Sequence, residues 1–561
     1  MTGQAEPVAF DPAGHRRGQV SPRRPVPSHA HEPHRDGDPP PPPVPMPTRS
    51  MRRSRHERDT LRGHILAGRR DAVDRQHKLG KYTARERLGL LLDPDSFVEM
   101  DLYRRQNAGP RSGDRPHGDG VVAGSGTIDG RRVFVYAQDF TVSGGSVGYA
   151  HAAKVQKVMD LAIATGSPLI GLLDSGGARI QEGVMALHGF GEIFRRNVAA
   201  SGVIPQISVI LGPCAGGAAY SPALTDFTFM VRKTAKMYLT GPDVVEAVSG
   251  EQVSHEELGG ADMHAGRSGV ATIVHDDEES CLQDVRYLVS MLPGNNLERA
   301  PGEVDRGATV DRRPRLAEIV PAEPNRPYDM RQVIAEVADD GDFFELQETW
   351  AANVVCALAR IDGAVVGVVG NQPTVLAGVL DRFASQKAAR FVRFCDAFSI
   401  PLVTLVDVPG FMPGTEQEHA GIIRYGAQLL YAYCEATVPR IQVILRKAYG
   451  GAYIVMDSRS IGCDLSLAWP TNEIAVMGAE GAVNVLHRKQ LAAAADPAAL
   501  RAELVGEYQD EYMHSQYAAE RGLVDDVIDP ADTRAAIARG LAMLRDKYTA
   551  GPDRKHGNMP L

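Results

Sequence analysis

The chain has 561 residues, enough for two large cores, and 43% of them are apolar and 23% charged, as in a globular protein. Its formal net charge of -9 argues against nucleic acid as the main partner, because there is no basic excess to neutralise phosphates. The six cysteines are scattered without metal-ligand spacing, so we expect no metal site and a reducing, cytoplasmic compartment. The sequence has no apolar run of about 18 residues and no signal-peptide pattern, which predicts no membrane span.

Residues 1–58 are predicted to form a disordered tail. They are rich in proline, including Pro39 to Pro43, and show no apolar periodicity. Such a segment cannot bury enough apolar surface to offset the entropy of ordering. Met51 opens a charged helical pattern and looks like a natural start, so we expect the residues before it to have no folding role. A helical pattern continues from Asp59 to Leu92.

Strands and helices then alternate. Val133–Ala137, Leu169–Leu173 and Ile207–Leu211 are short apolar runs, typical of a sheet that is buried on both faces. Gly148–Ala164 has helical spacing and is followed by Gly166-Ser-Pro168, a stop signal. This alternation predicts right-handed crossovers and a mostly parallel sheet.

The second half repeats the pattern with Ala364–Val369, Ser385–Phe398, Leu402–Val406 and Ile441–Leu445. Between the halves, residues 293–327 are rich in proline and charge, as expected of a linker. We therefore expect two domains, residues 59–310 and 311–561.

The halves also match residue by residue, at a nearly fixed offset. Pro168-Leu-Ile-Gly-Leu-Leu-Asp174 has the pattern of Pro401-Leu-Val-Thr-Leu-Val-Asp407, and Lys154 matches Lys387. Several matches at one offset indicate that a whole domain has been duplicated, since the period is far too long for a solenoid repeat.

Glycines follow the last strand of each matched pair. Gly212, Gly216 and Gly217 come directly after Ile207–Leu211, and we expect a helix to follow. Two N–H groups at such a helix start could stabilise an oxyanion. The element recurs in Lys447-Ala-Tyr-Gly-Gly-Ala-Tyr453. Because duplication would also copy a simple packing turn, the structural and functional interpretations both stay open.

A second glycine turn follows the preceding strand, at Asp174–Glu182 in the first half and at Asp407–Gly414 in the second. In open parallel sheets, ligands bind beyond the carboxyl ends of the strands. Each half therefore offers two glycine turns at one edge of its sheet.

Other chemistries have weaker support. Ser175 and Ser221 have no recognisable His and Asp partners, so we interpret them as turn or capping residues. No dinucleotide fingerprint or phosphate-binding loop is present. Four glutamates near the turns are interpreted as solvated or structural: Glu182, Glu246, Glu416 and Glu418.

Together, these motifs resemble the carboxyltransferase β subunit of biotin-dependent acyl-CoA carboxylases of the propionyl-CoA and acetyl-CoA type. The resemblance covers roughly residues 60–561. The stretches that carry it are Gly80–Leu88, Asp139–Ser146, Asp174–Gly183, Ala215–Ala223, Lys387–Phe391, Asp407–Phe411, Ala448–Tyr453, Ala468–Pro470, Ala475–Ala479 and His556–Leu561.

The resemblance implies an α/β fold made by tandem duplication of a crotonase-like ββα-type domain. It implies that the first domain binds acyl-CoA at Ser175, Gly176, Gly177 and Ala178, with Gly216 and Gly217 as the oxyanion hole for the thioester enolate. It implies that the second domain binds biotin at Gly410, Phe411 and Tyr453, with Gly451 and Ala452 holding the ureido oxygen.

The implied reaction moves a carboxyl group from carboxybiotin to the α-carbon of acetyl-CoA or propionyl-CoA. Carboxybiotin supplies both CO2 and, after its release, the base. The chain has no biotinyl domain with an acceptor Met-Lys-Met, so biotin must arrive on a separate biotin carboxylase/biotin carrier α subunit. The resemblance also implies a ring-like hexamer with active sites between subunits. It further implies that Ile454 borders the acyl pocket, and the acyl chain that this pocket prefers stays open.

Two alternatives remain at this level. One is a biotin-dependent decarboxylase subunit, which would use the same two sites in reverse. The other is a non-catalytic assembly subunit, against which the intact glycine pairs in both halves argue.

Overall fold

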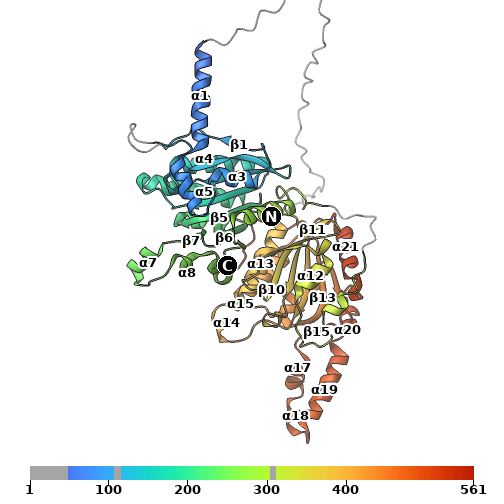
Figure 1. Ribbon diagram of the computed structural model, residues 1–561. Coiled ribbons are helices and arrows are strands. Elements are labelled where there is room, and N and C mark those ends of the chain that lie inside the picture. Colours follow the sequence, from blue (N-terminus) through green and yellow to red (C-terminus); the bar gives the residue numbers. More distant parts are fainter. Residues whose placement is uncertain (1–48, 107–114, 303–310, 561) are drawn as a thin grey trace, which may run out of the picture. The chain divides into compact units, whose positions relative to one another are not determined.

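The computed structural model describes residues 49–106, 115–302 and 311–560 (Figure 1). The chain divides into two compact units, residues 1–62 and 63–561. The described part of the first unit belongs to α1 (Arg49–Ala67), a charged helix. Because α1 begins before Asp59, the prediction of disorder is wrong for residues 49–58. Residues 1–48 and the predicted boundary at residue 310 lie outside the described ranges.

The described residues of the second unit form two eight-stranded sheets, one from each half of the sequence. The first has the order β1-β2-β3-β4-β5-β6-β8, with β7 also paired to β5. Its strands are β1 (Val98–Met100), β2 (Val121–Ile128), β3 (Arg131–Gln138), β4 (Leu169–Ser175), β5 (Gln206–Ala215), β6 (Phe227–Val231), β7 (Lys236–Tyr238) and β8 (Ile273–His275).

The second sheet repeats this order as β9-β10-β11-β12-β13-β14-β16, with β15 paired to β13. In both sheets the first three strands are antiparallel and the rest parallel, which confirms the expected mostly parallel sheet. The strands are β9 (Phe343–Leu346), β10 (Val354–Ile361), β11 (Ala364–Asn371), β12 (Leu402–Val408), β13 (Arg440–Tyr449), β14 (Leu465–Ala468), β15 (Glu473–Ala475) and β16 (Asp526–Val527).

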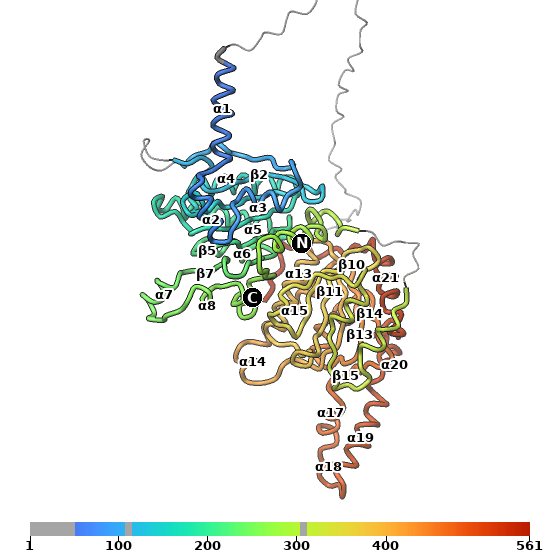
Figure 2. The backbone as a smooth tube through the Cα atoms, in the orientation of Figure 1, coloured from blue at the N-terminus to red at the C-terminus, as the bar shows by residue number. Residues whose placement is uncertain are grey.

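The helices follow the same duplication, and Figure 2 shows the two repeats as consecutive stretches of the chain. The first repeat has α2 (Arg70–Lys78), α3 (Ala84–Leu91), α4 (Tyr149–Thr165), α5 (Val184–Ala200), α6 (Gly217–Leu224), α7 (Pro242–Ser249), α8 (His255–Gly259), α9 (Ala261–Met263) and α10 (Glu278–Met291). The second has α11 (Leu316–Ile319), α12 (Met330–Val337), α13 (Arg382–Ala397), α14 (Thr415–His419), α15 (Ile422–Glu435), α16 (Gly450–Val455), α17 (Ala479–Leu486), α18 (Arg488–Ala493), α19 (Pro497–Tyr512), α20 (Ser515–Ala519) and α21 (Thr533–Leu544).

The crossover helix of the first half ends where the sequence predicts. α4 ends at Thr165 and is followed by Gly166, whose φ of 58° lies in the left-handed region, and Pro168 stops further helix. Lys154 on α4 and Lys387 on α13 are both buried, and each ammonium donates to two backbone carbonyls. Burial lowers the pKa of Lys154 to about 8 and also lowers that of Lys387.

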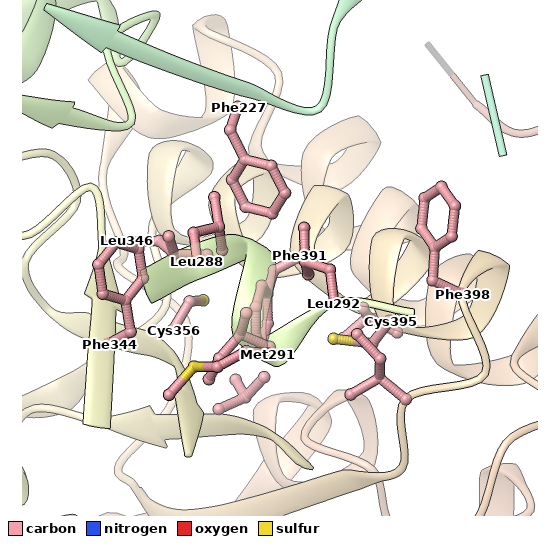
Figure 3. Close-up of a cluster of buried hydrophobic side chains, with 14 of the residues drawn as sticks. Phe227, Leu288, Met291, Leu292, Phe344, Leu346, Cys356, Phe391, Cys395 and Phe398 are labelled. Atoms are coloured by element: carbon pink, nitrogen blue, oxygen red, sulfur yellow. The ribbon is translucent and has the colours of Figure 1, made fainter. Parts of the chain in front are cut away.

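The largest apolar cluster draws on both halves of the chain (Figure 3). Phe227 of β6 and Leu288 of α10 belong to it together with Phe391 of α13 and with Phe398, which directly follows that helix. The rings of Phe227 and Phe394 meet edge to face, with centroids 4.8 Å apart. The two repeats therefore share one apolar cluster within the second unit, and each half also has a separate cluster of its own. No described helix has the length and apolar character needed to cross a bilayer.

Candidate functional site

The first pair of candidate donors lies where β5 passes into α6. Gly216, with a φ of 63°, makes the turn, and its N–H donates to the carbonyl of Tyr238 at 3.0 Å. The N–H groups of Gly217 and Ala218 have no acceptor among the described residues. Of the expected donor pair, the Gly216 N–H is therefore already hydrogen-bonded. The two N–H groups without an acceptor are those of Gly217 and Ala218, one residue further along the chain.

The second half has the same arrangement where β13 passes into α16. Gly450, with a φ of 58°, takes the place of Gly216. Within the described ranges the N–H groups of Gly451 and Ala452 find no acceptor. Gly451 and Ala452 match Gly217 and Ala218 in the duplication, so the two halves present equivalent donor pairs at equivalent helix starts.

The glycine turns of the first half are in direct contact. Gly177 has a φ of 92°, and a Cβ there would lie 2.8 Å from the carbonyl oxygen of Ala215. The hydroxyl of Ser175 accepts the N–H of Gly177 at 3.1 Å, which is the behaviour of a turn serine. The structure thus brings Ser175–Ala178 against the end of β5, one residue before the donor turn.

In the second half, the turn after β12 pairs with the segment before α13. Leu380 donates its N–H to Gly410 at 3.0 Å and accepts the N–H of Met412 at 2.8 Å, so Phe411 is bridged to Leu380. Tyr453 is 9% exposed, and burial raises the pKa of its hydroxyl. Ile454 is 41% exposed. Of these two α16 residues, Ile454 is therefore the more available to a ligand.

A buried aspartate lies under each donor turn, at a β-bulge. In the first half this is Asp174, which accepts from Lys81 at 2.7 Å, Arg87 at 2.9 Å and Gln76 at 3.0 Å. A Cβ at Gly212 would lie 1.9 Å from the Asp174 carboxylate, so the glycine leaves room for this ion pair. Burial lowers the pKa of Lys81, against the opposing effect of Asp174.

In the second half the aspartate is Asp407 of β12, and its cation comes from the neighbouring strand β13. Arg446 occupies the position of Gly212 and pairs with Asp407 at 3.0 Å. The backbone N–H of Lys447 donates to the other carboxylate oxygen at 3.1 Å. Burial lowers the pKa of the Lys447 ammonium, although Asp407 acts in the opposite direction.

Exposed apolar side chains follow both donor turns, and the sequence analysis missed most of them. Tyr220, Leu239 and Val248 are exposed in the first half. When α6 is aligned with α16 and β7 with β15, their counterparts are Ile454, Val476 and Val485, which are also exposed. The nearly constant offset between these apolar residues could have revealed them.

The other chemistries considered gain no support. The Ser221 hydroxyl donates to Asn197 at 2.9 Å in a buried contact. The described residues contain no group of three or more His, Cys, Asp or Glu placed to hold a metal ion. A cavity of about 660 Å³ borders Phe227 and Phe391 but includes none of the glycine turns.

Comparisons with known proteins agree with this geometry. Residues 75–559 match the carboxyl transferase domain. The propionyl-CoA carboxylase beta chain of Saccharopolyspora erythraea is 58% identical over 512 residues, covering 89% of this chain and 94% of the relative. The methylmalonyl-CoA decarboxylase subunit alpha of Veillonella parvula is 54% identical over 493 residues, covering 87% and 95%.

A solved structure of the transcarboxylase 12S hexamer, with methylmalonyl-coenzyme A and methylmalonic acid bound, superposes with a TM-score of 0.88. It is 50% identical, and the match covers 92% of this chain and 99% of that one. Fold and family match thus define a carboxyltransferase built from two crotonase-like domains. The chain belongs to the carboxyl transferase domain family, and it is an enzyme subunit whose relatives include biotin-dependent carboxylase β chains.

Proposed function

We propose that this chain moves a carboxyl group from carboxybiotin, carried on a separate biotin carboxylase/biotin carrier α subunit, to the α-carbon of a short-chain acyl-CoA. Relatives named propionyl-CoA carboxylase favour propionyl-CoA, with methylmalonyl-CoA as the product. The observation that carries the proposal is the pair of free backbone donors at the same place in both halves. We assign residues 59–310 to acyl-CoA and 311–561 to biotin.

The first half would stabilise the thioester enolate. The N–H groups of Gly217 and Ala218 open α6, so the positive end of the helix dipole lies beside them. Donors that are already in place before charge develops lower the barrier without reorganisation. Ser175, Gly176, Gly177 and Ala178 would border the acyl-CoA, since their turn rests on the end of β5.

The second half would hold biotin in the same way. The residues present fit such a group, because Gly451 and Ala452 offer unused donors to a ureido oxygen and Ile454 offers apolar surface beside them. Gly410, Phe411 and Tyr453 would support this side. When bound, carboxybiotin supplies the CO2 and then the base, so the chain needs to position reactants and stabilise two oxyanions.

The contacts of the described polar side chains near the donor turns support this division of labour. Ser175 and Ser221 are engaged in structural hydrogen bonds, as is Glu182, which accepts from Arg179. No described serine of the glycine turns is paired with a histidine. A reaction in which the base arrives with the substrate fits such a site.

A second copy of the chain would complete each site. Exposed apolar residues flank both donor pairs, and exposed apolar side chains that gather beside a site are typical of an interface. Transcarboxylase 12S is described as a hexamer assembly, and we propose a hexamer here. Light scattering should give an oligomer, and an active monomer would contradict this assignment. A cytoplasmic location stays a prediction.

Decarboxylation is the second candidate function. Two relatives, 51% and 54% identical, are named methylmalonyl-CoA decarboxylase subunit alpha. Such a subunit would use the same donors in the reverse direction. The direction of net transfer then depends on the partner subunits rather than on the residues of this site.

Two assays separate these possibilities. The chain, the biotin-carrying subunit, ATP and labelled bicarbonate should fix label into propionyl-CoA, with acetyl-CoA and butyryl-CoA as chain-length comparisons. The chain alone should transfer the carboxyl group of methylmalonyl-CoA to free biotin. Transfer to biotin without ATP-driven carboxylation would favour the decarboxylase. Failure of both assays would contradict the carboxyltransferase proposal itself.

A further inference from the structure

Three buried charged side chains hold the segment that directly follows the first glycine turn. Arg179 donates to Asp119 at 2.5 Å and to Glu182 at 2.9 Å, and the three side chains are 3%, 1% and 2% exposed. A second guanidinium nitrogen donates to the carbonyl of Ser146 at 2.7 Å. We call Arg179, Asp119 and Glu182 the arginine clamp.

The clamp also closes the start of α4. Glu182 accepts the N–H of Tyr149 at 2.7 Å, and Asp119 accepts the N–H of His151 at 2.9 Å. These bonds satisfy two donors that the first turn of a helix leaves free. A Cβ at Gly148 would lie 2.2 Å from the Glu182 carboxylate, so the helix must begin with glycine for the carboxylate to reach it.

Asp119 itself has a strained backbone. Gly118, Asp119 and Gly120 have φ values of 80°, 50° and 74°, and a residue with a Cβ rarely occupies this region. The ammonium of Lys154 donates to the carbonyl of Gly118 at 3.1 Å and so helps to hold this turn. Strain of this kind persists where surrounding contacts fix it, and it is concentrated at functional sites.

The second half lacks the clamp. There α13 is capped by its own Asp381, which accepts the N–H of Ala384 at 2.8 Å. When the bridge Val147–Ala178 is aligned with the bridge Leu380–Phe411, the positions of Arg179 and Glu182 hold Met412 and Thr415. The clamp therefore distinguishes the half that we assign to acyl-CoA.

We propose that Arg179 is a positioning residue for the acyl-CoA side of the reaction. Arg179 directly follows Ala178, and its N–H donates to Val147 at 3.0 Å. Gly177 in turn rests against Ala215, one residue before the donor turn. Fixing Arg179 on α4 thus fixes the surface that would border the acyl-CoA and its register with the Gly217 and Ala218 donors. This inference rests on the proposed function.

The test compares Arg179→Lys with Arg85→Lys. Lysine keeps the charge but has a single nitrogen, so it cannot make both the Nη1 contacts to Asp119 and Glu182 and the Nη2 contact to Ser146. Arg85 makes a bidentate pair with Glu99 in the same half, at 2.8 and 3.0 Å, away from the turns. Both variants are assayed as the full oligomeric chain, with methylmalonyl-CoA and free biotin as substrates.

We expect Arg179→Lys to lower kcat/KM for the CoA thioester about 100-fold, since small misplacements in a site have effects of this size. The KM for biotin should stay within about twofold. In the ligand-free protein, amide exchange of residues 175–183 should rise. Arg85→Lys should stay within about twofold of the parent chain in all three measurements.

An unchanged CoA thioester kcat/KM in folded Arg179→Lys would overturn the inference, even if amide exchange rises, because the clamp would then be merely structural. The inference would also be overturned if the KM for biotin rose as much as the kcat/KM for the CoA thioester fell. If Arg179→Lys does not assemble, Glu182→Gln replaces it in the same assays, with the same expected and contradicting results. Failure of the proposed function shows separately, as no transfer by the parent chain.

Discussion

The two halves of the second unit solve the same electrostatic problem with different residues. Asp174 and Asp407 occupy the same bulge beneath the same donor turn, and each donates its N–H to a side-chain amide of the neighbouring strand. In the first half the cations come from Lys81 and Arg87, far earlier in the chain. In the second half the cation is Arg446, on the adjacent strand. The buried aspartate is thus common to both halves, and the cation that neutralises it comes from a different part of each half.

The two halves also differ in how many elements the buried aspartate connects. Because Arg87 also pairs with Glu278 of α10, the first-half aspartate joins three elements into one buried network. Asp407 has a single ion-pair partner among the described residues. The first site therefore has redundant support and the second does not, which predicts unequal responses to matched substitutions.

The largest expected effect is on stability. Arg446→Met should lower the free energy of unfolding by about 3 to 5 kcal/mol, because it leaves the buried Asp407 carboxylate without its ion-pair partner. Lys81→Met should lower it by about 1 to 3 kcal/mol, since Arg87 still pairs with Asp174. The loss of unfolding free energy in each variant is measured from the first transition of a urea unfolding curve. Equal losses would mean that the redundancy of the first half has no energetic consequence.

The next effect is on catalysis and tests the division between the halves. Gly217→Pro removes one donor at a helix position where proline is tolerated, and Gly451→Pro removes its counterpart. Each should lower kcat about 100- to 1000-fold. Calorimetry should show that Gly217→Pro impairs acyl-CoA binding and Gly451→Pro does not.

Both proline variants must first be shown to be folded and oligomeric by light scattering and circular dichroism. Equal loss of acyl-CoA binding in the two folded variants would contradict separate roles for the halves.

A smaller effect concerns substrate choice. Ile454→Asp should change the ratio of kcat/KM for propionyl-CoA to that for acetyl-CoA by about tenfold or more, because each methylene in an apolar pocket contributes roughly 1 to 3 kcal/mol. Tyr220→Asp is the matched change at the equivalent exposed position of α6. A parallel fall of both specificities in the Ile454 variant would make this residue structural.

The smallest effect is a pH dependence that the second half should lack. Burial raises the pKa of Asp226 to about 6, against the opposing hydrogen bond from the N–H of Gln206. Between about pH 4 and 6 the folded protein then holds a proton that the unfolded chain has lost, so stability falls as pH rises through this window. Its counterpart Asp464 also accepts a strand N–H but pairs with Lys547.

Because Asp226 is half-buried and borders the cavity, water reaches it, and we expect a change below about 1 kcal/mol. Asp226→Asn should remove this slope in thermal unfolding between pH 4 and 6. A slope that survives the substitution would have to come from other groups.

The sequence analysis assigned residues 49–58 to a disordered tail, although the charged helical pattern that opens at Met51 lies close to the observed start of α1. The starts of most buried elements were predicted well. The helix Arg49–Ala67 is charged along its length, so it has no apolar stripe from which a boundary could be read. β4 and α4, in contrast, are bounded by glycine and proline. β4 begins with a continuous apolar run typical of a buried strand, and α4 has apolar residues at helical spacing. Local patterns therefore place an element reliably where burial dictates its residues.

By itself, the sequence determined the duplication, the two matching sheets and the glycine turns at their edges, because apolar periodicity and glycine are local properties of the chain. The tertiary structure alone decided which N–H groups are free. The N–H of Gly216 donates to the carbonyl of Tyr238, and Asp174 pairs with Lys81, and both contacts join residues that are distant in sequence. Such partners depend on how the strands and helices pack, and a hydrogen bond between distant residues leaves no local pattern in the sequence.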